Sequence, residues 1–99
     1  MKIKEITISE GRIKYIIVEG DGQVGSFIEI LSIFIKEEYQ QKGFGTELIK
    51  RLTEIAKRNN CPTICIKANT DGENDIFGKF LIATGFEKSP MNVFEKTKL

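Results

Sequence analysis

A glycine-containing loop between an apolar segment and an amphipathic segment constrains this chain more than any other feature. Phe27–Ile35 is almost wholly apolar, which is typical of a strand covered on both faces. The loop after it reads Gln40-x-x-Gly43-x-Gly45, and residues 47–58 then repeat their apolar positions with a helical period. The glycines let the chain turn tightly and bring main-chain N–H groups close to a ligand. The start of the helix adds unpaired N–H groups and the positive end of its dipole. This segment therefore predicts an anion site, built largely from backbone, that would fit a diphosphate.

The other segments predict more strands and one more helix. Hydrophobic alternation and turn residues mark strands at Lys2–Ser9, Arg12–Glu19, Thr63–Ala68, Phe86–Lys88 and Val93–Thr97. A second helix begins after Asp71, a suitable N-cap, and ends at Gly85. Its apolar face carries Ile76, Phe77, Phe80 and Leu81.

This element order predicts the fold class. The first helix joins Phe27–Ile35 to Thr63–Ala68 and so predicts a parallel pair with a right-handed crossover. The order is β-β-β-α-β-α-β-β, and the class is α/β or α+β: a mixed, mostly antiparallel sheet with one central parallel strand–helix–strand crossover. Residues 1–99 are expected to form a single domain.

Composition and charge exclude several kinds of site. The chain contains no histidine, so it cannot build a Ser-His-Asp or Cys-His mechanism, and a metal site is not expected. Its 15 Lys and Arg residues against 14 Asp and Glu give a net charge of +1, without the basic excess of a nucleic-acid binder. No apolar run reaches membrane-spanning length, and the first residues lack the pattern of a signal peptide. We therefore expect a cytoplasmic protein.

The two cysteines agree with that compartment. Cys61 and Cys65 lie in what reads as one strand, which would put them on one face roughly 13 Å apart, too far for a disulfide. We interpret them as small buried hydrophobic residues rather than acyl carriers.

Motif spacing alone leaves the Gln40 loop open to several interpretations. An earlier pattern, Gly20-x-Gly22-x-x-Gly25, matches a dinucleotide fingerprint, but an apolar strand follows it where that fingerprint needs a helix. We interpret this pattern as a strand connection. The Gln40 loop is neither a Rossmann turn nor a P-loop. By itself it would fit a phosphate-binding turn for another nucleotide or a plain strand-to-helix turn.

A second motif narrows these alternatives. Asn74-x-x-Phe77-x-x-x-Leu81-x-x-x-Gly85-Phe86 lies on the second helix and its exit. Together the two motifs, within about residues 27–97, resemble the GNAT family of acetyl-CoA-dependent N-acetyltransferases. The resemblance implies that the loop binds the pyrophosphate of coenzyme A. It also implies that the second helix lies beside the pantetheine arm and the reacting thiol.

The resemblance assigns coenzyme contacts position by position. The loop would surround the pyrophosphate, largely through backbone N–H groups, with Gln40, Gln41, Lys42, Gly43, Phe44, Gly45 and Thr46. The main chain of the preceding strand would pair with the pantetheine amides at Ile33, Phe34 and Ile35. Asn74 would reach the coenzyme arm, and Asn69 is a weaker alternative because the stretch before the helix is longer than usual in the family.

Glu29 is the candidate general base. Its distance to Gln40 matches that of the general-base glutamate in the histone-acetylating branch of the family. Independently, it is the only charged residue in Phe27–Ile35, and burial makes a carboxylate a better acceptor of an ammonium proton. A carboxylate at an exposed strand position, or one facing a lysine across the sheet, is the alternative. A strand bulge, common at this place in the family, would re-aim the side chain.

Two features depart from the family pattern. Many members have a tyrosine four residues before the Gly-Phe pair, as the acid that protonates the leaving thiolate, whereas this chain has Leu81 there. Leu81 and Phe80 read as core residues, and water or Ser32 would have to supply the proton. A complete member also begins with another strand and two helices that wall the acceptor site. We therefore expect either a homodimer that rebuilds this wall or an open site for a large acceptor.

These observations predict an acyltransferase that moves an acetyl group from acetyl-CoA to a primary amine by direct attack. The coenzyme would lie in the splay between Phe27–Ile35 and Thr63–Ala68. The amine could belong to a small molecule or to a protein, and we expect no nucleic-acid or membrane partner. The rival interpretation is a non-catalytic coenzyme A-binding or dimerisation module.

Overall fold

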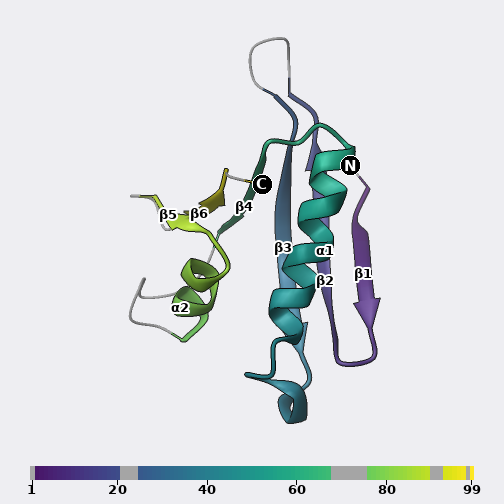
Figure 1. Cartoon of the computed structure of the whole chain (residues 1–99). Coiled ribbons are helices and arrows are strands. Elements are labelled where there is room, and N and C mark those ends of the chain that lie inside the picture. The colour runs from purple at the N-terminus through teal and green to yellow at the C-terminus, as the bar shows by residue number, and fades with distance from the viewer. Residues whose placement is uncertain (1, 21–24, 68–75, 90–92, 98) are drawn as a thin grey trace.

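One mixed sheet and two helices make up the described part of the chain (Figure 1). This computed structural model describes residues 2–20, 25–67, 76–89, 93–97 and 99. The strands are β1 (Lys4–Ile8), β2 (Gly11–Val18), β3 (Phe27–Ile35), β4 (Thr63–Lys67), β5 (Glu87–Lys88) and β6 (Val93–Lys96). The helices are α1 (Phe44–Arg58) and α2 (Ile76–Ala83), with a 3-10 turn at Glu37–Tyr39.

The sheet has the strand order β1-β2-β3-β4-β6-β5. Strands β3 and β4 run parallel, joined through α1, and the other neighbouring pairs are antiparallel. The predicted fold class and element order are therefore confirmed. No helix in the described residues is long and apolar enough to cross a membrane.

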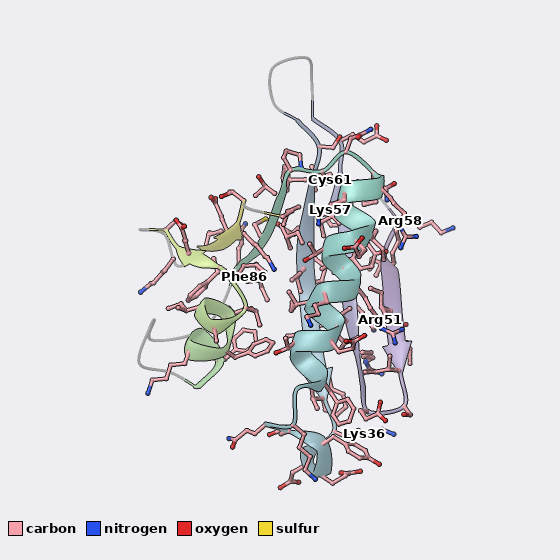
Figure 2. The ribbon with its side chains drawn as sticks, viewed as in Figure 1. Lys36, Arg51, Lys57, Arg58, Cys61 and Phe86 are labelled. Atoms are coloured by element: carbon pink, nitrogen blue, oxygen red, sulfur yellow. The ribbon has the colours of Figure 1, made fainter. Side chains whose placement is uncertain are left out.

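Both helices pack on the same face of the sheet, where the core lies. In Figure 1, α1 crosses β2 and β3, and α2 lies toward β5 and β6. Alternate strand positions meet the helices in one buried cluster, which contains Ile13, Tyr15, Ile28, Ile30, Leu48, Leu52, Ile64, Ile66, Leu81 and Phe94. Phe86, labelled in Figure 2, joins this cluster just after α2. Each large apolar side chain buried here contributes about 1.5–3 kcal/mol, so this layer holds the elements together.

The opposite face of the sheet is open in the described part of the chain. Leu31 and Phe34 of β3 are 44% and 50% exposed, while Ile28 and Ile30 on the helix side are buried. The prediction that Phe27–Ile35 is covered on both faces is therefore wrong. The segment is apolar on both sides, but the helices cover one of them.

The end of α1 separates the two cysteines. Asn60 is left-handed, with φ of 56°, and the Cys61 N–H donates to the Ala56 carbonyl at 2.8 Å, as at a helix that ends on a left-handed residue. Cys61 is buried beyond the last turn of α1, at the opposite end of the helix from Lys36 (Figure 2). Cys65 alternates with buried residues of β4 and so lies on the open face. The prediction that both cysteines share one strand and one face is wrong, because the helix cap holds Cys61 outside β4.

The other differences from the predicted elements lie at their ends. Strand β1 begins at Lys4 rather than Lys2, and the 3-10 turn after β3 was not predicted. The proposed Asp71 cap and the turn at Pro90 lie outside the described residues.

Candidate functional site

A cavity of about 570 Å³ lies where the end of β3, the following loop, the start of α1 and α2 meet. Its size is in the range of small-molecule sites. Aliphatic and aromatic side chains and the loop backbone line it: Ile33, Ile35, Tyr39, Gln40, Gln41, Gly43, Gly45, Thr46, Phe77 and Phe80.

Left-handed residues shape the loop on one side of this cavity. Gln41 has φ of 61° and Gly43 has φ of 90°. The conformation suits glycine, but for Gln41 it costs about 1–2 kcal/mol, so neighbouring contacts must hold it. One such contact is the Gln40 side chain, whose Nε2 donates to the Ile35 carbonyl at 3.1 Å.

The start of α1 presents free backbone donors to the cavity. Its N-cap, Gly43, makes no side-chain capping bond, and the first helical bond runs from the Glu47 N–H to the Gly43 carbonyl at 3.0 Å. The N–H groups of Phe44, Gly45 and Thr46 therefore have no acceptor within the helix. Such N–H groups, together with the positive end of the helix dipole, favour a bound anion.

Gly45 and Phe80 bring the two helices together beside this anion site. A Cβ on Gly45 would lie 2.9 Å from Cζ of Phe80, so the ring can approach the first turn of α1 because no side chain intervenes. The Phe80 ring also stacks with Phe77, with centroids 6.2 Å apart. The prediction that Leu81 is a core residue is confirmed, since its side chain is 0% exposed. Phe80 packs against the core and also lines the cavity.

Strand β3 extends beyond its parallel partner next to the cavity. It pairs with β4 from Phe27 to Ile30, so within the described residues, which do not include 68–75, residues 31–35 have no partner on this side. Residues 32–35 pair with β2 on their other side, and the backbone N–H and C=O groups that do not face β2 point to the side where β4 ends. An extended ligand that carries amide groups could pair with this edge as an added strand.

A bulge interrupts β3 where the two strands separate. Tyr15 of β2 lies opposite Ile30, and Lys14 lies opposite Ser32, so Leu31 has no opposing residue. Such a bulge turns the extra residue and its neighbours relative to the regular pleat. The sequence analysis considered a bulge that would re-aim Glu29, and the register shows one at Leu31, two residues further along β3.

Most of the predicted coenzyme residues lie together. The cavity lining includes Ile33, Ile35, Gln40, Gln41, Gly43, Gly45 and Thr46. The Phe34 side chain does not line the cavity, because it lies on the open face with the Arg12 guanidinium 5.6 Å from its ring. Lys42 is exposed, and Phe44 packs edge-to-face on Tyr39 with centroids 5.6 Å apart. Asn74 and Asn69 lie outside the described residues.

Three aromatic lining residues were not predicted as part of the site. Tyr39 precedes the glycine loop, and Phe77 and Phe80 lie one helical turn apart on α2. The spacing of Phe77 and Phe80 was interpreted as the apolar face of a helix that packs on the core. The same spacing also places both rings on one side of α2, where they form a cavity wall.

Glu29 lies on the open face of the sheet and does not line the cavity. It is half-buried in β3, opposite Ile16 of β2 and Cys65 of β4. Ile33, at the cavity, is four residues further along the strand, a distance of about 13 Å. The row continues to β6, where Glu95 lies opposite Cys65. Among the described residues, neither carboxylate has an ion-pair partner.

Cys65 is held as a neutral thiol between these carboxylates. Burial, together with the nearby Glu29 and Glu95 and against a smaller opposite effect of Lys67, raises its pKa to about 11. At neutral pH it is therefore a poor nucleophile. In the described part of the chain, no three His, Cys, Asp or Glu side chains are grouped to hold a metal ion.

The parallel strand pair and the uncapped start of α1 place the chain in the class of α+β proteins whose helix N-termini can bind a phosphate-bearing ligand. Within that class the chain belongs to the GNAT acetyltransferases: the family described as "Acetyltransferase (GNAT) family" matches residues 11–81. None of the curated proteins matches the sequence significantly.

Solved structures of low sequence identity share the fold. A GNAT-family acetyltransferase from Staphylococcus aureus Mu50 is 15% identical, with a TM-score of 0.68 over 87% of this chain and 58% of that one. The NatC complex bound to Gag peptide and CoA is 16% identical, with a TM-score of 0.71 over 86% and 57%. A mutant AtaT toxin bound to acetyl-CoA and the C-terminus of the antitoxin AtaR is 13% identical, with a TM-score of 0.67 over 87% and 58%. The chain thus spans a little over half the length of these proteins.

Proposed function

We propose that this protein transfers an acetyl group from acetyl-CoA to a primary amine. The observation that carries the proposal is one continuous backbone surface: the unpaired edge of β3 at residues 31–35, followed by the free N–H groups at the start of α1. The edge can pair with an arm that carries amides, and the helix start can bind a diphosphate. Coenzyme A contains both groups in one chain. Two of the similar structures contain CoA or acetyl-CoA.

The residues around this surface fit coenzyme A. Ile33 and Ile35 provide apolar contact for the pantetheine arm beside the unpaired edge. A Cβ on Gly43 would meet no heavy atom within 4 Å, so open space lies beside the loop where a diphosphate would bind. The exposed Lys42 adds a positive charge to the same loop.

In the proposed reaction, Glu29 accepts the proton that the acceptor ammonium must lose, directly or through water. Acetyl-CoA supplies the acetyl group as a thioester. The freed amine forms a bond to the carbonyl carbon, and a backbone N–H of the β3 edge stabilises the charge on the carbonyl oxygen until the carbon–sulfur bond breaks. The nitrogen gives up its second proton as the amide forms, and water or the exposed Ser32 hydroxyl relays a proton to the departing sulfur. The separation of β3 from β4 allows an arm held on the helix side to reach the face that carries Glu29.

The charges on the open face support an amine as the acceptor. Glu29 and Glu95 lie two strands apart on one row, without an ion-pair partner in the described residues. Two such carboxylates can attract an alkylammonium group, even though Lys14 and Lys67 lie on the same face. The amine could belong to a small molecule or to a protein side chain. A homodimer stays a prediction, which sedimentation at micromolar concentration tests.

A non-catalytic coenzyme A-binding module is the second candidate, and Leu81 favours it. At the position of the tyrosine acid of many family members, this chain has an apolar side chain that is 0% exposed. The module would bind coenzyme A and acetylate no amine. Binding and turnover must therefore be measured separately.

Thermal unfolding with acetyl-CoA, CoA, ATP or NAD, each added alone, tests binding. A ligand at about 100 times its dissociation constant stabilises by about 2.7 kcal/mol, which in a domain of this size raises the midpoint by about 10 °C or more. We expect this shift with acetyl-CoA and CoA. The absence of a shift with both, in a folded sample, would contradict the proposed coenzyme.

Turnover is then measured as release of free CoA thiol in the presence of diamines, amino sugars or lysine peptides. Mass spectrometry of the acceptor identifies the acetylated amine. Binding without acetylation of any acceptor class would support the module instead.

A further inference from the structure

Opposite charges alternate along three neighbouring strands on the open face of the sheet, β2, β3 and β4 (Figure 1). Glu29 of β3 lies opposite Ile16 of β2 and Cys65 of β4. Two residues further along these neighbours, on the same face, are Lys14 of β2 and Lys67 at the end of β4. Because β2 runs antiparallel to β3 and β4 runs parallel to it, both lysines lie on the cavity side of Glu29. Diagonal neighbours on adjacent strands are about 7–8 Å apart.

These charges are not neutralised by ion pairs within the part of the chain that the structure describes. The pairs found there include none of Glu29, Lys14 and Lys67. Glu5 of β1 lies across from Lys14, but its carboxylate pairs with Arg12 at 3.9 Å. The Lys14 side chain is half-buried and the Lys67 side chain is exposed. Both ammonium groups can therefore bind an anion from outside the chain.

Strand β3 contributes a hydroxyl and an apolar side chain between the two lysines. Ser32 lies opposite Lys14, and the bulge residue Leu31 comes directly before it. Both side chains are exposed. An anion bound between Lys14 and Lys67 can therefore also accept a hydrogen bond from the Ser32 hydroxyl. An aliphatic chain that runs from this anion toward Glu29 passes Leu31.

We propose that the acceptor carries a carboxylate as well as its amine, separated from the amine by a short aliphatic chain. Glu29 binds the ammonium end, and Lys14 and Lys67 bind the carboxylate end. The chemistry is that of an ω-amino acid or of a lysine side chain next to an acidic residue. This inference rests on the proposed function, because it names the class of amine that the same site acetylates.

A diamine is the competing acceptor, since its second ammonium could bind Glu95. Glu95 lies on the far side of Cys65 from Glu29, two strands away. The lysines instead border residues 31–35, the edge where the thioester is proposed to lie. A second ammonium placed on that side would be repelled by both lysines. The arrangement therefore favours a negative group at the far end of the acceptor.

Initial rates with four acceptors of equal length test the inference. Hexylamine, aminohexanoate, its amide and diaminohexane end in an apolar, a negative, a polar and a positive group. We expect aminohexanoate to have a kcat/KM about three- to tenfold above that of its amide, mainly through a lower KM, and diaminohexane to be the poorest acceptor. Added salt should reduce this preference, because it screens exposed charges.

Two lysine peptides distinguish the possible sources of the carboxylate. One has aspartate next to the lysine, and the other has asparagine there. A preference for the aspartate peptide alone supports the inference and assigns the acceptor to a protein. A preference for aminohexanoate alone supports it and assigns the acceptor to a free ω-amino acid.

Substitution of the lysines tests their part directly. In Lys14→Gln and in Lys67→Gln, the KM for aminohexanoate should rise about two- to fivefold, with kcat and the KM for hexylamine unchanged. Lys50→Gln is the matched control, because Lys50 is an exposed lysine of α1, on the covered side of the sheet. It should leave both KM values unchanged.

Equal kcat/KM for aminohexanoate and its amide, together with equal values for the two peptides, would overturn the inference. A preference for diaminohexane would also overturn it and would assign the far end of the acceptor to Glu95. If a lysine variant fails to fold, the acceptor series with the unaltered protein decides alone. Acetylation of none of these amines would instead refute the proposed function, and the inference with it.

Discussion

The two faces of the sheet use alternate residues of the same strands for different purposes. On the covered face, Ile28 and Ile64 are wholly buried beneath the helices. On the open face, their strands contribute Glu29 and Cys65, which are half-buried and lie beside each other. Successive side chains of a strand point to opposite faces, so adjacent positions in the sequence separate the core from the proposed base. Residues on one face of the sheet can therefore be substituted without changing the side chains on the other face.

The largest expected effect is the loss of stability caused by a substitution on the covered face. Phe94 is 0% exposed, and Phe94→Ala should lower the free energy of unfolding by about 3–5 kcal/mol, because it removes a large ring from the core. Phe34→Ala removes the same ring from the open face, where it contacts Arg12, and should cost less than about 1 kcal/mol. Urea unfolding of both variants measures the difference. Equal losses would mean that the open face is also part of the core.

The next effect concerns chemistry on the open face. Glu29→Gln removes the proposed base and should lower turnover about 100-fold or more, with the free energy of unfolding and the CoA dissociation constant nearly unchanged. Steady-state thiol release and calorimetry measure these quantities. Glu5→Gln is the control, since Glu5 lies on the open face of β1 and makes an exposed 3.9 Å ion pair with Arg12. Wild-type turnover in Glu29→Gln would remove Glu29 from the mechanism.

Alanine at either loop glycine should lower the free energy of unfolding, but for different reasons. Gly43→Ala should cost about 1–2 kcal/mol, because φ of 90° disfavours any side chain. Gly45→Ala should cost about 1 kcal/mol through its clash with Phe80. Combining each change with Phe80→Ala in a double-mutant cycle separates the causes. Phe80→Ala should reduce the loss of stability caused by Gly45→Ala and leave that caused by Gly43→Ala unchanged. A reduction of both losses would show that α2 also constrains Gly43.

The fold could be predicted from sequence because local signals were strong and agreed with one another. Apolar runs, the stripe on α1 and the glycine loop determine which segments become strands, helices and turns. Most of the predicted coenzyme residues line one cavity because they belong to the same loop and to the strand before it, and their role stays a prediction. Asn74 stays a prediction, because it lies outside the described residues.

Tertiary relations could not be predicted in the same way. An apolar run does not show whether one or both faces of its strand are covered by other elements. Phe34 and Leu31 were therefore expected to be buried, and they are exposed. Spacing on α2 marks an apolar side but not whether it meets core or cavity, which is why Phe77 and Phe80 were missed. The position of Cys61 depends on how α1 ends, which the residue pattern of a strand does not contain.

The smallest effect is a pH dependence on the open face. Burial and the neighbouring carboxylates raise the pKa of Cys65 from 9.0 to about 11, so the folded protein holds this proton more tightly than the unfolded chain does. The resulting stabilisation is present below about pH 9 and is lost as the pH rises toward 11. Because the thiol is half-exposed, we expect it to be less than about 1 kcal/mol and absent in Cys65→Ala.

Alkylation rates of Cys65 between neutral and alkaline pH, followed by mass spectrometry to separate it from Cys61, measure the same proton directly. The midpoint should lie near 11 and should fall in Glu29→Gln, because the carboxylate opposes ionisation of the thiol. Glu5→Gln, two strands from Glu29 on the same face, should leave it in place. An alkylation midpoint that is the same in Glu29→Gln as in the unaltered protein would mean that the Glu29 carboxylate does not act on the Cys65 thiol. The open face would then lack the charge coupling that distinguishes it from the covered one.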